Sequence, residues 1–238
     1  MKKHRSNALL FADARQALLG RMTFVSWSFV LYMIISIFVN QLGSAVDLSN
    51  WLLTLVFGLA AGFVTSTFAS LFGIGLSSIF LNLQYGQPAA VRNLFIAFSG
   101  DIDRSVRVRL FVTLGEMVCL LPIQLLLYFS PWEHAPQFIP LVPVVCVISS
   151  AAYLCWTMTY AMTNYLLLDF PDQDAARILQ ASRNLMRGNR LRLFLLYLRL
   201  MPMHLLGIFS LGIANVFASC CQFACSAAFY KDLMSPQA

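Results

Sequence analysis

Long apolar runs separated by short polar segments constrain this chain more than any other feature of its sequence. A helix needs about 20 mostly apolar residues to cross the hydrocarbon core of a bilayer. Within the core, only helices and closed barrels satisfy all of their backbone hydrogen bonds. The sequence therefore predicts an all-α membrane protein with six transmembrane helices. They span residues 22–42, 51–83, 110–129, 138–168, 193–210 and 214–230.

The composition agrees with this reading. Hydrophobic residues make up 59% of the chain and charged residues only 11%, whereas soluble domains carry about 25% charged residues. A surface so poor in charge suits contact with lipid. A signal peptide cleaved after Ala45 is an alternative to a permanent first span, but the run over 22–42 is long enough to cross.

Apart from Arg199, the Lys and Arg residues fall in four clusters, at 2–21, 92–109, 177–192 and 231. The segments 43–50 and 130–137 contain no Lys or Arg and carry Asp47 and Glu133. Short cytoplasmic loops are enriched in Lys and Arg, so both termini are expected in the cytoplasm. The net charge of +6 comes from the Lys and Arg residues of these predicted cytoplasmic segments. We therefore expect the partners to be the bilayer and its anionic headgroups, and we expect no nucleic acid.

Three segments outside the spans read as amphipathic interfacial helices, at 7–19, 88–98 and 172–188. In the last of these, apolar residues recur at helical spacing opposite a basic face. The basic residues assigned to interfacial faces are Arg15, Arg92, Arg177, Arg183, Arg187 and Arg190.

These segments also indicate an internal repeat. Arg15-Gln16-Ala17-Leu18-Leu19-Gly20 matches Arg183-Asn184-Leu185-Met186-Arg187-Gly188, and the segment from Arg92 to Gly100 is a weaker copy. Each copy precedes an outgoing and a returning span. The predicted units are 7–85, 88–168 and 172–232, each an interfacial helix followed by a helical hairpin. Chance similarity between apolar segments is the alternative. The second and fourth spans are longer than one crossing needs, and Gly73 and Gly75 predict a break in the second.

The last unit carries a family resemblance. It contains Tyr160-Ala161-Met162-Thr163-Asn164-Tyr165, then Asp169-Phe170-Pro171, then Ser182 to Arg190 with Leu185-Met186 and Gly188. This succession resembles bacterial membrane proteins of the domain of unknown function 975 family. The chain departs from the family pattern around 201–204 and 218–220. The resemblance implies a multi-pass protein of the bacterial cytoplasmic (inner) membrane, and it supplies no activity.

Two charged residues lie inside predicted spans, where charge is costly and marks function by default. Glu116 and Arg199 each follow a boundary arginine by seven residues, which places both about 10 Å into their helices. We hypothesise an intramembrane ion pair between them. Independent snorkelling of the two side chains and a substrate or proton role for Glu116 are the alternatives.

Catalytic machinery is not visible in the sequence. His4, His134 and His204 are far apart in the predicted topology, and no nucleophile elbow, zinc-protease or phosphate-loop motif occurs. Met201, Met203 and His204, with Cys221 and Cys225, allow a copper(I) alternative, but no paired-cysteine spacing supports it. We expect no cofactor and no metal.

The sequence therefore favours a non-enzymatic membrane protein, either transport-related or an envelope-maintenance factor. A scaffold that docks a membrane protein partner, for example as a subunit of an ABC transporter, is the alternative. A membrane-embedded enzyme is a third and weaker one. A cavity lined by clustered polar residues would favour transport.

Overall fold

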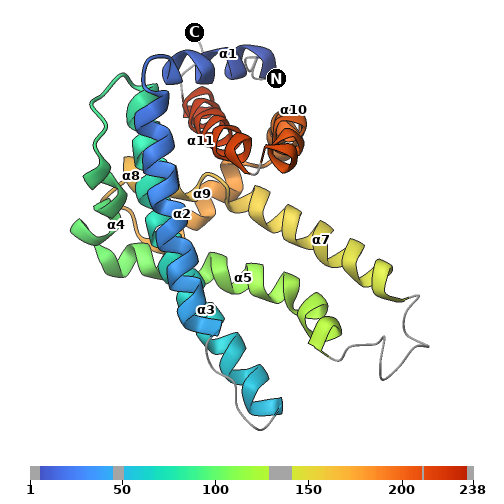
Figure 1. Ribbon diagram of the computed structural model, residues 1–238. Coiled ribbons are helices and arrows are strands. Elements are labelled where there is room, and N and C mark those ends of the chain that lie inside the picture. The colour runs from blue at the N-terminus through green and yellow to red at the C-terminus, as the bar shows by residue number, and fades with distance from the viewer. Residues whose placement is uncertain (1–5, 45–50, 129–140, 211, 235–238) are drawn as a thin grey trace.

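A computed structural model describes residues 6–44, 51–128, 141–210 and 212–234 (Figure 1). Within these ranges the regular elements are all helical. In chain order they are α1 (Asn7–Leu18), α2 (Met22–Ser44), α3 (Trp51–Gln84), η1 (Val91–Phe95), α4 (Ile96–Ser99), α5 (Ile102–Tyr128), α7 (Leu141–Tyr160), α8 (Thr163–Asp169), α9 (Ala175–Leu185), α10 (Arg190–Phe209) and α11 (Ile213–Met234). The predicted end at 129 and start at 138 lie outside the described residues.

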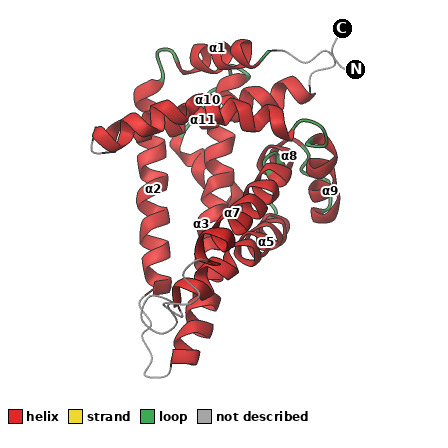
Figure 2. Ribbon diagram, turned by 90° about the vertical axis from the view of Figure 1, so that its right-hand side faces the viewer, coloured by secondary structure: helices red, strands yellow, loops and turns green. Residues whose placement is uncertain are grey.

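Consecutive long helices pack as three pairs, α2 with α3, α5 with α7, and α10 with α11. Figure 1 and Figure 2 show the pairs leaving a common base in different directions, with α10 and α11 running across the direction of α2. At this base α1 packs against α11, α10 and α3. α1 thus joins the last helix pair to α3, while η1, α4 and α8 pack against α3, and α9 packs against α5 and α7.

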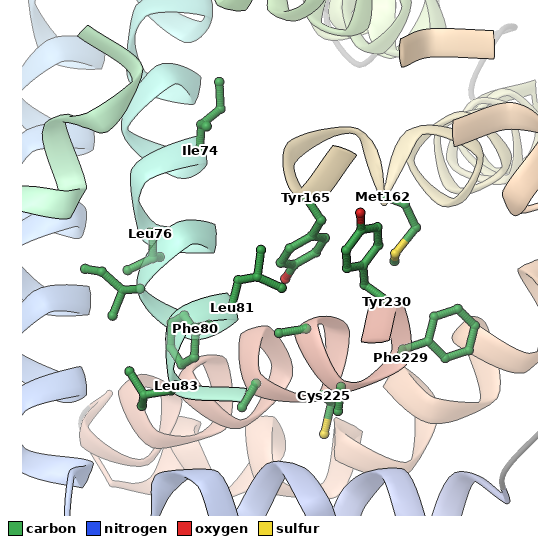
Figure 3. Packing of buried hydrophobic residues seen from close by; sticks show 14 of the residues in the cluster. Ile74, Leu76, Phe80, Leu81, Leu83, Met162, Tyr165, Cys225, Phe229 and Tyr230 are labelled. Atoms are coloured by element: carbon green, nitrogen blue, oxygen red, sulfur yellow. The ribbon is translucent and has the colours of Figure 1, made fainter. Parts of the chain in front are cut away.

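The buried core lies at this base (Figure 3). It takes the last turns of α3, including Phe80, and the last turns of α11, including Phe229 and Tyr230, all fully buried. Farther along the pairs, large apolar side chains such as Phe38 and Val147 are exposed. Because exposed apolar patches of this extent are unusual in water-soluble monomers, these surfaces are suited to lipid.

Four helices are long and apolar enough to cross a membrane among the residues described. They are Met22–Gln41, Val56–Gln84, Ile102–Leu126 and Leu141–Asp169. α10 and α11 are not among them. α10 carries Arg190, Arg192 and Arg199 within its 20 residues, and α11 supplies much of the buried base. That α10 and α11 cross the membrane stays a prediction.

Several helices in the structure differ from their predicted boundaries. The predicted break at Gly73 and Gly75 is wrong, since α3 is one helix of 34 residues. Gly75 instead permits close packing, because a Cβ there would overlap the backbone of Leu94 in η1.

The other long span does divide, because α7 ends at Tyr160 and α8 begins at Thr163. The predicted helix at 88–98 is the short pair η1 and α4. The predicted helix at 172–188 is shorter, since α9 covers only Ala175–Leu185.

The first and third predicted units share a local backbone conformation. Gly20 and Gly188 both have positive φ, +75° and +84°, which glycine adopts without a steric penalty. Arg21 N–H donates to the Leu18 carbonyl at 3.1 Å, and the corresponding Asn189 N–H donates to Met186 at 3.1 Å. In the second unit Gly100 has φ −101°, so its turn differs. The division into three units stays a prediction.

Candidate functional site

A polar cluster lies where α3, α5 and α8 meet. The Arg109 guanidinium donates to the Asn164 side-chain oxygen, and Asn164 Nδ2 donates to Ser77 Oγ at 3.2 Å. Gly73 lies beside this cluster, where a Cβ would be in ordinary van der Waals contact, at 3.8 Å, with Arg109 and the Tyr32 hydroxyl. Ser77 is buried and Arg109 is half-buried. Because buried polar groups are costly when they lack hydrogen-bond partners, these bonds favour this relative placement of the three helices.

Cations from neighbouring elements cover the ends of the returning helices. Arg104, in the first turn of α5, donates to the carbonyls of Leu167 at 3.2 Å and Phe170 at 3.0 Å, at the end of α8. Lys231 Nζ, in α11, donates to the last carbonyl of α3, that of Gln84, at 2.7 Å. The final carbonyls of a helix lack intrahelical partners and favour positive charge. These contacts therefore connect the helix pairs at the base.

A buried ion pair and an aromatic stack complete the base. Arg192 Nη2 lies 2.7 Å from Asp232 Oδ2. The Arg192 side chain is 16% exposed and that of Asp232 is 2% exposed. The Tyr230 hydroxyl donates to Asp169 at 2.6 Å, and the Tyr230 ring stacks on Tyr165 with centroids 5.2 Å apart (Figure 3). Just after α3, partial burial and then the Asp169 charge raise the pKa of the Tyr85 phenol. The base is thus held by polar contacts between distant parts of the chain.

A polar groove runs between α3 and α5, with Tyr153 of α7 at one side. It has a volume of about 420 Å³. Gly58 and Gly62 leave this side of α3 open, since a Cβ at either position would meet no atom within 4 Å. Its polar lining consists of Thr54, Ser66, Thr113, Glu116, Gln124 and Tyr153.

One face of α5 connects the groove to the cluster at the base. Arg109, Thr113, Glu116 and Gln124 are separated by intervals of four, three and eight residues, which place them on one side of a helix. Arg109 is bonded to Asn164. In the described part of the chain, Glu116 has no hydrogen bond or ion pair. This arrangement leaves a carboxyl group facing the groove, within a helix that is suited to crossing a membrane.

The structure does not bring Glu116 and Arg199 together. No ion pair joins them within the described ranges. Glu116 lines the groove, and the charge that acts on it is that of Arg109 on its own helix. Arg199 is exposed, and its guanidinium carbon lies 5.6 Å from the centre of the Phe11 ring of α1. The two residues therefore belong to different surfaces.

The predicted basic residues lie around the base. Arg190 is half-buried, and the other five, Arg15, Arg92, Arg177, Arg183 and Arg187, are exposed. On α9 the opposite side contributes Ile178 and Ser182 to the buried interior. Contact of these arginines with headgroups stays a prediction.

A second cavity, the α1 cavity, lies between α1, α10 and α11 and has a volume of about 390 Å³. Its lining includes Arg15, Met22, Met203, Cys221 and Cys225, and so gathers some of the sulfur atoms considered for copper. Two of the residues considered for copper lie apart from this lining. Met201 is exposed, and His204 Nδ1 lies 3.2 Å from the Leu200 carbonyl of its own helix. No group of three His, Cys, Asp or Glu that could hold a metal occurs among the described side chains. All six cysteines are free thiols.

Sequence reasoning missed Arg109, Asn164 and Ser77 as a set. Arg109 is the last residue of a basic cluster that is predicted to be cytoplasmic, and Asn164 belongs to the motif that carries the family resemblance. A signal was present, because an asparagine and a serine inside apolar runs are costly unless they find partners. Their pairing could not be predicted from the sequence, because Asn164 lies 55 residues from Arg109 and 87 residues from Ser77 along the chain.

The fold defines an all-helical protein with at least four helices suited to crossing a membrane. The family described as "Protein of unknown function (DUF975)" matches residues 9–237. The chain belongs to this family, and the match extends over all three predicted units. No curated protein and no solved structure matches the chain significantly.

Proposed function

We propose that this chain is a transport-related protein of the bacterial cytoplasmic membrane that holds a ligand in the polar groove between α3 and α5. One observation carries the proposal. Glu116 presents its carboxylate to a groove that also contains hydroxyl and amide side chains, at a depth where an isolated charge is costly. A ligand with a cationic group would offset that cost. Binding and passage require no bond-making chemistry, so the proposed role is non-enzymatic.

The groove has the features expected of a binding site in a helical membrane protein. Its volume of about 420 Å³ lies within the range of about 300–1,000 Å³ for small-molecule sites. Apolar side chains such as Met117 and Leu120 share the lining with the polar groups. Such a surface fits a small amphiphile with a positive end. Arg109, at the base end of the same helix face, would disfavour passage of that positive end while it stays bonded to Asn164.

The proposed topology has six spans in three hairpins, with both termini in the cytoplasm. Four spans are suited to crossing by length and hydropathy. α10 and α11 have 20 and 22 residues, which is enough to cross, and Gly212 between them has φ +89°, as a tight turn requires. The Lys and Arg clusters support a cytoplasmic base. A topology reporter inserted at Gly212 should be periplasmic. A cytoplasmic signal there would remove the last two crossings.

Thiol accessibility tests the groove directly. In a cysteine-free background, Ser66→Cys places a thiol in the groove, and Val64→Cys, two residues away, places one on a surface that is 64% exposed and suited to lipid. Thiolates form and react in water, so a membrane-impermeant thiol reagent should label Ser66→Cys and leave Val64→Cys unlabelled. Equal protection of both positions would refute a hydrated groove and the transport role with it.

A further inference from the structure

The α1 cavity combines an apolar lining with positive charge, and it is separate from the groove. Phe11, Leu18, Met22 and Met203 provide apolar surface, and Arg15 contributes a cation. The volume is about 390 Å³, which is large enough for a small molecule or part of a chain. The cavity lies against α1, which belongs to the basic N-terminal segment. A molecule that binds there must match both the apolar lining and the positive charge.

Two guanidinium groups flank this cavity. Arg15 lines it and is exposed. Arg199 is exposed and lies 5.6 Å from the ring centre of Phe11, which itself lines the cavity. Neither arginine forms an ion pair with an acidic side chain in the ranges that the structure describes. The cavity thus has uncompensated positive charge beside an apolar interior.

We propose that the α1 cavity binds one anionic phospholipid, with its phosphate held by Arg15 and Arg199 and an acyl chain in the apolar interior. Guanidinium groups are well matched to phosphate oxygens. An acyl chain removes the apolar lining from water, which a small inorganic anion cannot do. An amphiphile with a negative head satisfies both features. Such a lipid would also tie α1 to α10 and α11.

Native mass spectrometry of the purified protein tests the headgroup. The probes are phosphatidylglycerol and phosphatidylcholine of the same chain length. A basic residue near an anionic lipid surface contributes about 1 kcal/mol, so Arg15→Gln and Arg199→Gln should each lower the affinity for phosphatidylglycerol about fivefold. Arg183→Gln is the matched control, because Arg183 corresponds to Arg15 in the predicted repeat and is exposed on α9. It should leave the affinity unchanged.

The chain-binding part is tested without changing charge. Met203→Trp should fill the cavity and abolish the retained phosphatidylglycerol adduct, and sn-glycerol 3-phosphate should not compete. Equal retention of phosphatidylcholine, an equal loss in Arg183→Gln, or an unchanged adduct in a folded Met203→Trp would each overturn the proposal. Displacement by glycerol phosphate would show a site for a soluble phosphate and would overturn it too. Arg15 and Arg199 are exposed, so their variants remain informative if Met203→Trp does not fold.

Discussion

Replacing Gly75 with alanine should destabilise the protein, although alanine is normally the better helix former. Gly75 lies in the interior of α3, where η1 crosses it. A Cβ at this position would overlap the carbonyl and Cα of Leu94. Leu94 is fully buried, and the obstruction is backbone, which cannot move aside as a flexible side chain can. The substitution must therefore separate η1 from α3.

The cost follows from the nature of the clash. Inserting a methyl group into a well-packed interior costs about 1–3 kcal/mol. Alanine offsets part of this, since it is favoured over glycine in a helix by about 0.5–1 kcal/mol. At about 2–4 °C per kcal/mol for a chain of this size, we expect the unfolding midpoint to fall by several degrees.

A thiol-reactive fluorescent dye suits this measurement because all six cysteines are free and two of them, Cys220 and Cys225, are buried in the folded protein. Gly58→Ala is the matched control, since it lies on the same helix and a Cβ there would meet no atom within 4 Å. At one fixed heating rate, Gly75→Ala should unfold earlier than wild type and Gly58→Ala should not. Equal midpoints for the two variants would refute the close packing of η1 on α3.

The remaining predictions concern the polar contacts of the base and use the same assay. Arg109→Gln should cost about 2–3 kcal/mol, because it removes a charged hydrogen bond and leaves its partner unsatisfied. Arg107→Gln, which removes an exposed surface ion pair, should leave the unfolding midpoint close to that of wild type, and equal losses of stability in Arg107→Gln and Arg109→Gln would contradict the cluster. Arg192→Gln and Asp232→Asn should each cost about 3–5 kcal/mol, since each breaks a buried ion pair by removing one of its two charges. The double variant should lose less than the sum, whereas additivity would show that the pair is not coupled. Tyr230→Phe should cost about 1–2 kcal/mol by removing one buried hydroxyl bond, and a wild-type midpoint would argue against that bond.

The helices were largely predictable because hydropathy acts locally. A run of apolar residues is helical in a bilayer whichever helix it meets, so the ranges for α2, α10 and α11 differ from prediction by only a few residues at each end. The role of Gly75 was not predictable. A glycine within an apolar run is consistent with a break or with a close contact, and only the position of Leu94, 19 residues further along the chain, decides between them.

The candidate site was predictable in part. Glu116 stood out because a carboxylate inside an apolar run is costly anywhere in a membrane. Whether Glu116 pairs with Arg199 depends on how α5 and α10 are oriented about their own axes, and no local sequence pattern specifies that orientation. The structure turns Glu116 toward α3 and Arg199 toward α1. The groove forms only where α3 and α5 face each other. The sequence of either helix alone therefore does not predict it.

Charge selectivity at the groove tests the central claim most directly. The thiol of Ser66→Cys would be labelled with a cationic and with an anionic methanethiosulfonate of similar size, in the presence of Glu116 and in Glu116→Gln. If Glu116 presents a carboxylate to a hydrated groove, the cationic reagent should react faster, and the preference should disappear in Glu116→Gln. A rate ratio unaffected by Glu116→Gln would contradict a cation-accepting groove between α3 and α5.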